Sequence, residues 1–219
     1  MNLTPSAQHC DAHKAEQPFW SHEASLIPLC QLLVQRYPEL LLELTELTLA
    51  LKPFKKFPDY GLYSSGWEAF PLSIYEGEFN DHVPELSQMD MSGLAKQIRP
   101  FVPLLSELIT PLEDAGQLRN VFVSRLKPGS YIRPHRGWTS NYLRIHLGLL
   151  CDPACRITVG NETQSWLPGQ LLAFKDGGPY LHSVRHDGSR DRIVISLDLR
   201  LKYVQSFIPQ IQGDHLGLS

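Results

Sequence analysis

Five short runs rich in valine, isoleucine and leucine dominate the second half of the chain, and they constrain its fold more than any other feature. Glycine, proline, aspartate and asparagine separate these runs, as expected where turns join short strands. The runs are residues 120–126, 143–150, 155–159, 170–174 and 192–199. Several short strands at such close spacing are typical of a β-sandwich or barrel. We therefore predict a β-rich core between Arg119 and Tyr203.

The first half of the chain has a different pattern, with leucines recurring at helical spacing between residues 25 and 51. Such spacing predicts amphipathic helices whose leucines pack on the core. Pro38 divides the leucines into two sets, so the pattern fits two helices or one kinked pair. A second helical region, again with prolines at its turns, is predicted over residues 91–112.

Residues 52–82 are predicted to be irregular, since prolines and glycines interrupt them repeatedly. The segment is also rich in aromatic side chains: Phe54, Phe57, Tyr60, Tyr63, Trp67, Phe70 and Tyr75. An aromatic loop of this kind is a candidate for a substrate mouth. Plain packing against the core explains most of these residues more simply.

We expect a single domain, because apolar residues make up 42% of the 219 residues and are enough for an ordinary core. Its expected parts are a flexible tail over residues 1–20, a helical and aromatic-loop region over 21–117 that packs on the core, a β core over 118–205, and a tail over 206–219. The predicted class is mainly β with flanking helices.

Charge and composition argue against several classes of function. The net charge is -3, so no basic excess is present to bind nucleic acid or an anionic membrane. No segment is long and apolar enough to cross a bilayer, and residues 1–17 do not resemble a signal peptide. We therefore expect a cytoplasmic protein with reduced cysteines. Cys151 and Cys155 have the spacing of half a metal site, but without a second pair two buried or turn thiols are the simpler interpretation.

A histidine follows the strand-like run at residues 130–133, in the sequence Pro134-His135-Arg136-Gly137. Neutral imidazole at the end of a strand can bind a metal ion. A lone histidine in this position is more often a hydrogen-bonded surface or core residue. On its own, His135 is therefore only a candidate ligand.

The run from Leu143 to Leu149 alternates between apolar and polar side chains, as a β-strand does. The leucines and the isoleucine share one face, while Arg144, His146 and Gly148 share the other. The polar face is either exposed to solvent or lines a polar cavity inside a barrel. Its place beside the other polar candidates favours the cavity.

The last strong strand begins at Arg192, ten residues after His182. A buried arginine needs an anionic partner, and its planar guanidinium can bind a carboxylate with two parallel hydrogen bonds. Two interpretations stay open. Arg192 pairs with Asp191 or Asp198 of the same chain, or it binds the distal carboxylate of a small diacid.

These histidines point to one kind of metal chemistry. Iron(II) oxygenases commonly hold the metal with two histidines and one carboxylate, and they leave other coordination positions open for co-substrate and O2. The carboxylate usually lies two residues after the first histidine, where this chain has Gly137. The sequence thus offers His135 and His182 but no obvious third ligand.

The order of these motifs resembles the aspartyl/asparaginyl β-hydroxylase family. The resemblance is carried by Pro128-Gly129, Pro134-His135-Arg136-Gly137, Asn141, Leu143 to Leu149, Asn161-Glu162-Thr163, Trp166, Gly169-Gln170, Phe174, His182 and Arg192. It covers about residues 118–200 and implies a double-stranded β-helix core, jelly-roll or cupin-like, with an N-terminal helical region. The family lacks the metal carboxylate, so Gly137 fits the resemblance.

The resemblance implies roles for individual residues. His135 and His182 would be the catalytic residues that bind Fe(II). Arg192 and Ser124 would bind the far carboxylate of the co-substrate 2-oxoglutarate. His146 would lie near the carboxylate of 2-oxoglutarate at the iron.

Two further residues and one departure from the family pattern concern the pocket. Arg144 matches an arginine of the co-substrate or substrate pocket, and Trp67 matches a pocket tryptophan that would contact substrate. The segment from Lys175 to Pro179 departs from the family, which more often has a shorter acidic link there. The departure leaves the ligand assignment unchanged and concerns the shape of the loop beside the iron.

The activity implied by the resemblance is that of an Fe(II)- and 2-oxoglutarate-dependent dioxygenase that uses O2 to hydroxylate an unactivated carbon. The expected target is the β-carbon of an aspartate- or asparagine-like residue in a free amino acid, a carrier-linked amino acid or a peptide. No feature of the sequence predicts the oligomeric state.

Other activities stay open. In a halogenase, the glycine in place of the carboxylate would leave room for a halide. A non-catalytic barrel that binds a small molecule would keep the pocket without the reaction. A zinc hydrolase would need a third protein ligand and a general base, for which the sequence has no clear candidates.

Overall fold

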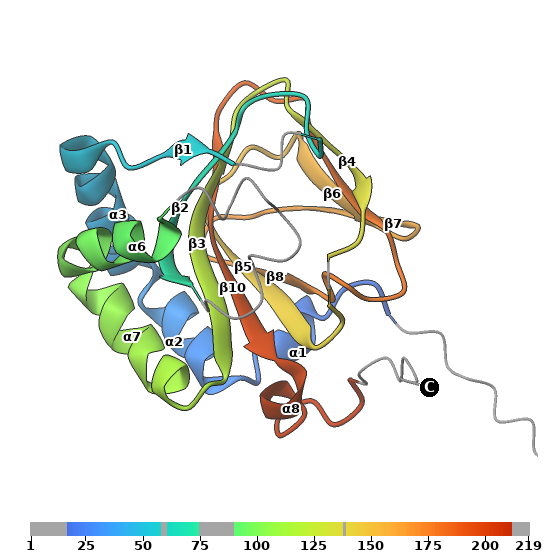
Figure 1. The fold of residues 1–219 in the computed structure, drawn as a ribbon. Helices are drawn as coiled ribbons and strands as arrows, with labels where there is room; N and C mark the ends of the chain where they lie inside the picture. Colours follow the sequence, from blue (N-terminus) through green and yellow to red (C-terminus); the bar gives the residue numbers. More distant parts are fainter. Residues whose placement is uncertain (1–16, 58–60, 75–89, 138, 212–219) are drawn as a thin grey trace, which may run out of the picture.

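A computed structural model of the chain describes residues 17–57, 61–74, 90–137 and 139–211 (Figure 1). The helices are α1 (Ser21–Ala24), α2 (Pro28–Gln35), α3 (Tyr37–Leu51), α6 (Met91–Ile98), η1 (Arg99–Phe101, a 3-10 turn), α7 (Pro103–Asp114) and α8 (Leu201–Val204). The strands are β1 (Lys55–Lys56), β2 (Trp67–Ile74), β3 (Leu118–Leu126), β4 (Tyr131–His135), β5 (Tyr142–Leu150), β6 (Cys155–Val159), β7 (Glu162–Ser165), β8 (Leu171–Phe174), β9 (His182–His186) and β10 (Arg192–Arg200). The predictions for residues 1–16 and 212–219, Tyr60, Tyr75 and Cys10 fall outside the described residues.

Two antiparallel sheets form a double-stranded β-helix. The larger sheet has the order β1-β2-β3-β10-β5-β8, and the smaller has the order β4-β9-β6-β7. From β3 onward the chain alternates between the sheets, since β4, then β6 and β7, and then β9 leave the larger sheet and the intervening strands return to it. This winding confirms the predicted class, a mainly β protein with flanking helices.

Helices α2, α3, α6 and α7 lie on one side of the six-stranded sheet, away from the four-stranded sheet (Figure 1). Pro38 lies in the first turn of α3. Backbone N–H groups in this turn have no partner within the helix, so proline, which lacks an N–H, is tolerated there. Arg36 separates α2 from α3, so residues 25–51 form two main helices rather than one kinked helix. Within the described residues, no helix combines the length and hydropathy that crossing a bilayer requires.

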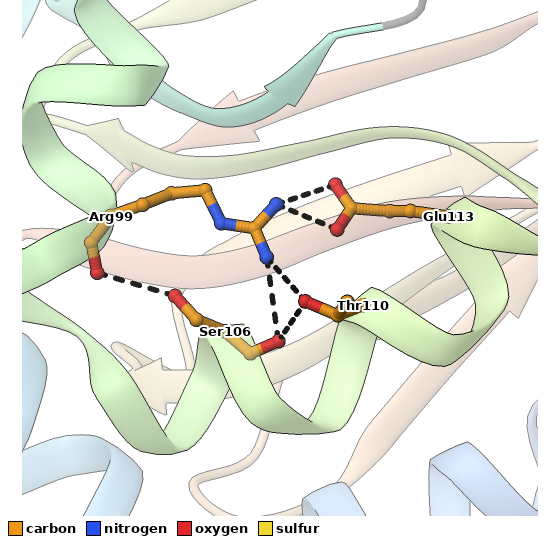
Figure 2. Close-up of polar contacts among 4 residues, drawn as sticks. All are labelled: Arg99, Ser106, Thr110 and Glu113. Atoms are coloured by element: carbon orange, nitrogen blue, oxygen red, sulfur yellow. Dashed lines mark hydrogen bonds and ion pairs between the residues drawn. The ribbon is translucent and has the colours of Figure 1, made fainter.

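Arg99, the first residue of the η1 turn, binds side chains of α7 (Figure 2). Arg99 donates from Nη1 to both carboxylate oxygens of Glu113, at 2.8 and 2.6 Å, and from Nη2 to the Thr110 hydroxyl at 2.7 Å. The Ser106 hydroxyl donates back to the carbonyl oxygen of Arg99 at 3.2 Å. These contacts lie on the side of the helical layer that does not carry the buried apolar residues of α7.

The prediction that residues 52–82 are irregular is wrong for Trp67–Ile74, which form β2. This strand pairs with β3 along its length, whereas β1 on its other side reaches only to Ala69. Pro71 cannot donate to a β-ladder, and it lies beyond β1 at a register shift against β3. Proline is tolerated at such an edge-like position, and the neighbouring strand therefore overrides the local sequence signal.

The register of the six-stranded sheet turns one set of polar side chains toward the four-stranded sheet. Across the sheet, Asp198 pairs with Arg144, Ser196 with His146, and Val194 with Ser124. Alternate residues of β10 share a face, so Arg192 lies on the same side as these residues. The fold thus lines the space between the sheets with polar groups.

Candidate active site

A cavity of about 190 Å³ lies between the two sheets, and it is lined by the seven residues to which the resemblance gives a role in the site. These residues are Trp67, Ser124, His135, Arg144, His146, His182 and Arg192. They come from β2, β3, β4, β5, β9 and β10. The polar face of β5 therefore lines a cavity rather than facing solvent.

His135 and His182 lie side by side because β4 and β9 pair at these residues. Their ring centroids are 4.0 Å apart. The Nδ1 atom of His135 lies 2.8 Å from the carbonyl oxygen of Arg133, which can only accept a hydrogen bond, so the proton is on Nδ1 and the lone pair is on Nε2. Burial, helped by the nearby His182, lowers the pKa of His135 to about 4. His135 is therefore a neutral imidazole, the form that binds metals.

His182 is buried beside the ring of Phe174, with 5.0 Å between ring centroids. Its Nδ1 atom has no hydrogen-bond partner among the described residues, and its Nε2 atom lies 3.3 Å from Oδ1 of Asp176. A buried, unpartnered nitrogen next to a second imidazole is consistent with a metal ligand. The described residues contain no cluster of three or more His, Cys, Asp or Glu side chains arranged to hold a metal. Among the described residues, His135 and His182 are therefore the candidate metal ligands.

Asp176 was not among the predicted site residues, yet its carboxylate fills the space beside Gly137. A Cβ atom added at Gly137 would lie only 1.8 Å from Oδ2 of Asp176, so a side chain at 137 and this carboxylate exclude each other. The Gly137 N–H donates to the carbonyl oxygen of Asp176 at 2.8 Å, which holds the two loops together. The segment from Lys175 to Pro179 thus places a carboxylate directly beside Gly137.

Arg144 joins two carboxylates at the same end of the cavity. It donates from Nε and Nη2 to the two oxygens of Asp198, at 2.8 and 2.9 Å, and from Nη1 to Asp176 at 2.5 Å. Burial raises the pKa of Asp176, but the charge of Arg144 outweighs it and holds this pKa below the usual range. The geometry gives Arg144 a supporting role toward Asp176, and its predicted contact with co-substrate or substrate stays a prediction.

Arg192 is buried at the other end of β10, only 2% exposed. The partners considered for it are engaged elsewhere, since Asp198 binds Arg144 and Asp191 lies 3.9 Å from Arg125. The described residues place no carboxylate against the Arg192 guanidinium, and its Nε has no hydrogen-bond partner there. Burial is the main reason that its pKa is lowered. A buried cation of this kind is suited to an anionic ligand.

The surroundings of Arg192 consist of an indole ring and two thiols. The guanidinium carbon lies 4.7 Å from the centre of the Trp166 ring, a cation–π geometry. Cys155 is buried and forms a hydrogen bond with Arg192, while Cys151 is half-buried nearby. Both are free thiols whose pKa is raised by burial, so the interpretation of two buried or turn thiols fits the structure.

Two indole N–H groups reach polar side chains of the cavity. Trp67 donates from Nε1 to the Ser124 hydroxyl oxygen at 3.0 Å, and Trp166 donates from Nε1 to Nδ1 of His146 at 3.1 Å. Trp67 also stacks on Phe57, with 3.9 Å between ring centroids and 12° between the rings. Local sequence patterns do not predict these contacts, because residues that are far apart along the chain make them.

Three further arginines of β3, β4 and the segment after β4 differ in position. Arg136 lines the cavity and donates to the carbonyl oxygen of Pro179 at 2.6 Å. Arg125 forms an ion pair with Glu68, and Arg133 donates to the carbonyl oxygen of Gly61. Of these three, only Arg136 is among the cavity-lining residues.

Sequence similarity links the chain to known proteins. A profile of the family described as "Aspartyl/Asparaginyl beta-hydroxylase" matches residues 35–201. Human "Aspartate beta-hydroxylase domain-containing protein 2" is 40% identical over 83 residues, which are 36% of this chain and 22% of that protein. Human "Aspartyl/asparaginyl beta-hydroxylase" is 38% identical over 85 residues, 38% of this chain and 11% of that protein. The match thus spans less than a quarter of the length of these relatives.

Among solved structures, the chain is similar to a prolyl-4-hydroxylase from Pseudomonas putida. The superposition has a TM-score of 0.43 and 14% sequence identity, and it covers 83% of this chain and 90% of the other.

Proposed function

The chain belongs to the aspartyl/asparaginyl β-hydroxylase family, and from this premise we propose that it is an Fe(II)- and 2-oxoglutarate-dependent dioxygenase. The proposal includes His135 and His182 as iron ligands, and Arg192, Ser124 and His146 as the groups that bind 2-oxoglutarate. The observation that carries it is Arg192, a buried cation without a described carboxylate partner, in the same cavity as the histidine pair.

The donor set fits the proposed metal. His135 presents an unprotonated Nε2 because its Nδ1 is bound to a backbone carbonyl, and His182 keeps a buried nitrogen without a partner. Asp176 adds negative charge beside the pair, which favours a bound cation. When bound, iron and 2-oxoglutarate would supply the oxidising chemistry, in which 2-oxoglutarate and O2 give succinate and CO2 and a C–H bond becomes C–OH.

The charges in the cavity support the proposed co-substrate pocket. The guanidinium of Arg192 can hold one carboxylate of 2-oxoglutarate through charge-assisted hydrogen bonds, with the Ser124 hydroxyl as a neighbouring donor. His146 pairs with Ser196 of β10, and Arg144 pairs with Asp198 two residues further along that strand. His146 therefore lies between Arg192 and the end of the cavity that holds Asp176. These residues bind and orient the co-substrate, while the apolar walls around them exclude water.

The position of Asp176 supports the hydroxylase over the halogenase alternative. A halide would need the space that the glycine at 137 leaves open. In this chain the carboxylate of Asp176 occupies that space and would repel an anion. The position of Asp176 therefore favours hydroxylation over halogenation.

For the substrate, we propose an aspartate- or asparagine-like residue in a free amino acid, a carrier-linked amino acid or a peptide. The name of the relative "Aspartyl/asparaginyl beta-hydroxylase" supports this class. Phe57, Leu62 and Trp67 line the cavity and would contact the apolar part of such a substrate.

The test combines turnover with co-substrate binding. Purified protein with iron(II), ascorbate and 2-oxoglutarate under air is expected to form succinate, followed by NMR, and the His135→Ala/His182→Ala double variant is not. Under anaerobic conditions, Arg192→Met should raise the Kd for 2-oxoglutarate about 10- to 100-fold, because hydrogen bonds to a charged group are lost. Its affinity for iron(II) should stay unchanged.

Each possible failure has a distinct meaning. Wild-type protein that binds neither iron(II) nor 2-oxoglutarate would contradict the proposal. Binding of 2-oxoglutarate without succinate formation across a panel of amino acids and peptides would favour the non-catalytic barrel. A chlorinated product that depends on added chloride would favour the halogenase.

A further inference from the structure

We propose that the indole N–H groups of Trp166 and Trp67 are positioning groups, which set His146 and Ser124 as hydrogen-bond donors to the two carboxylates of 2-oxoglutarate. The inference rests on the proposed function for the identity of the ligand. Its structural part, the direction in which each donor points, follows from the protein alone.

The contact between Trp166 and His146 fixes one tautomer. An indole N–H can only donate, so the His146 Nδ1 atom, 3.1 Å away, must carry a lone pair. Burial, followed by the charges of Arg192 and Arg144, holds the pKa of His146 well below its usual value, so the ring is neutral and has one proton. That proton is therefore on Nε2, on the other side of the ring.

The position of His146 allows its Nε2–H group to donate a hydrogen bond into the cavity. His146 shares the cavity face of β5 with Arg144, and it lies opposite Ser196 of β10. The ring contacts Phe174, which in turn contacts His182, with 5.6 and 5.0 Å between the ring centroids. An Nε2–H group at this place can donate to a carboxylate that lies next to the histidine pair. The opposite tautomer would present a lone pair to that carboxylate and repel it.

Trp67 acts on Ser124 in the same way. Its Nε1–H donates to the Ser124 oxygen at 3.0 Å, so this oxygen is an acceptor toward the indole. The hydroxyl proton must then point elsewhere, and Ser124 donates no hydrogen bond within the described residues. Ser124 pairs with Val194, two residues from Arg192 on the same face. The hydroxyl proton is thus left available to donate into the cavity, on the face of the sheet that also carries Arg192.

Trp166 also contacts Arg192, so its position affects both proposed carboxylate-binding groups. The same ring that donates to His146 stacks under the guanidinium of Arg192, at 4.7 Å. Because Trp166 is 1% exposed, it has little freedom to move. One rigid side chain therefore orients a donor for each end of the diacid, which is a form of preorganisation.

A purely structural role for the two indoles predicts different behaviour. In that case the hydrogen bonds only satisfy buried polar atoms, and losing them lowers stability without a specific effect on the ligand. A tautomer measurement separates the two explanations. Trp166→Phe is a suitable variant, since it keeps an aromatic ring under Arg192 and removes only the N–H and part of the ring.

The first measurement is a long-range 1H–15N NMR spectrum of the histidine ring nitrogens in the metal-free protein. In the wild type, His146 is expected to carry its proton on Nε2. In Trp166→Phe the Nδ1-protonated form should become detectable, whereas Trp67→Phe should leave His146 unchanged. A wild-type proton on Nδ1 would overturn the inference without the need for any variant, so a variant that fails to fold does not prevent the test.

The second measurement is anaerobic binding. Each variant should raise the Kd for 2-oxoglutarate about 2- to 10-fold, the range of one net hydrogen bond, with iron(II) affinity unchanged. 2-Oxobutyrate lacks the distal carboxylate, so its binding should be weakened by Trp166→Phe and not by Trp67→Phe. Wild-type binding of 2-oxoglutarate that neither variant alters overturns this inference alone. A wild type that does not bind 2-oxoglutarate overturns the proposed function, and the donor role with it.

Discussion

The two faces of the six-stranded sheet are built from the same strands but have opposite compositions. The face under the helices is apolar and almost fully buried, with Val121 and Val123 of β3, Leu143, Ile145 and Leu147 of β5, and Ile195 and Leu197 of β10. The face toward the cavity carries serine, histidine and arginine from the same three strands, and Asp198 of β10 lies opposite Arg144 on this face. Because side chains alternate along a strand, one set of strands can serve stability on one side and ligand binding on the other.

The comparison explains how the cavity tolerates buried charge. Burying arginine and aspartate lowers stability unless these groups are paired. Arg144 has two carboxylate partners, whereas Arg192 has only an indole ring and a thiol among the described residues. The helix-covered face therefore has to supply the stability that the cavity face lacks.

The largest expected effect on stability comes from the helix-covered face. Leu197→Ala removes a fully buried side chain, so it should lower the free energy of unfolding by about 2–5 kcal/mol. Ser196→Ala changes the preceding residue of the same strand, which faces the cavity, and should change this free energy by less than about 1 kcal/mol. Denaturant unfolding of both variants measures the difference. Equal losses of unfolding free energy would show that both faces of the sheet contribute alike to stability, which would contradict the comparison.

A smaller effect is expected on the cavity face, where Asp198→Asn removes one charge from the Arg144 network. Loss of a hydrogen-bonded charge should lower the free energy of unfolding by about 1.5–3 kcal/mol. Arg144 then holds Asp176 less firmly, so iron(II) affinity should fall about 10-fold, as for other groups that orient a metal site. Anaerobic titration with iron(II) measures this. Asp191→Asn is the control, because Asp191 is half exposed and 3.9 Å from Arg125, and it should change neither quantity.

Sequence periodicity was sufficient to predict most of the fold, whereas the resemblance to the family predicted most of the residues that line the cavity. Alternation with a period of two separated Arg144 and His146 from the leucines of β5, and leucine spacing located α2 and α3. β2 was missed because Pro71 and nearby glycines mimic a loop, and only pairing with β3 makes the segment a strand. Local sequence does not encode that pairing.

The finer geometry of the site was not predictable for a related reason. Asp176 reaches the space beside Gly137 through a contact between two loops that are 39 residues apart in the sequence. Trp166 and His146 meet only because β8 pairs with β5 and places the preceding loop over the cavity. These contacts depend on loop conformation, for which a single sequence has no periodic signal.

The smallest expected effect tests whether the helical layer acts on the cavity at all. Glu113→Gln removes the charge that Arg99 binds (Figure 2), and this partly exposed pair should contribute only about 1 kcal/mol or less to the free energy of unfolding. Glu39→Gln, in an exposed pair with Arg36, is the control and should have no measurable effect. Neither change should alter the Kd for 2-oxoglutarate, because the apolar face of the sheet lies between these pairs and the cavity. A change in that Kd with Glu113→Gln would mean that the helices influence the ligand site through the sheet.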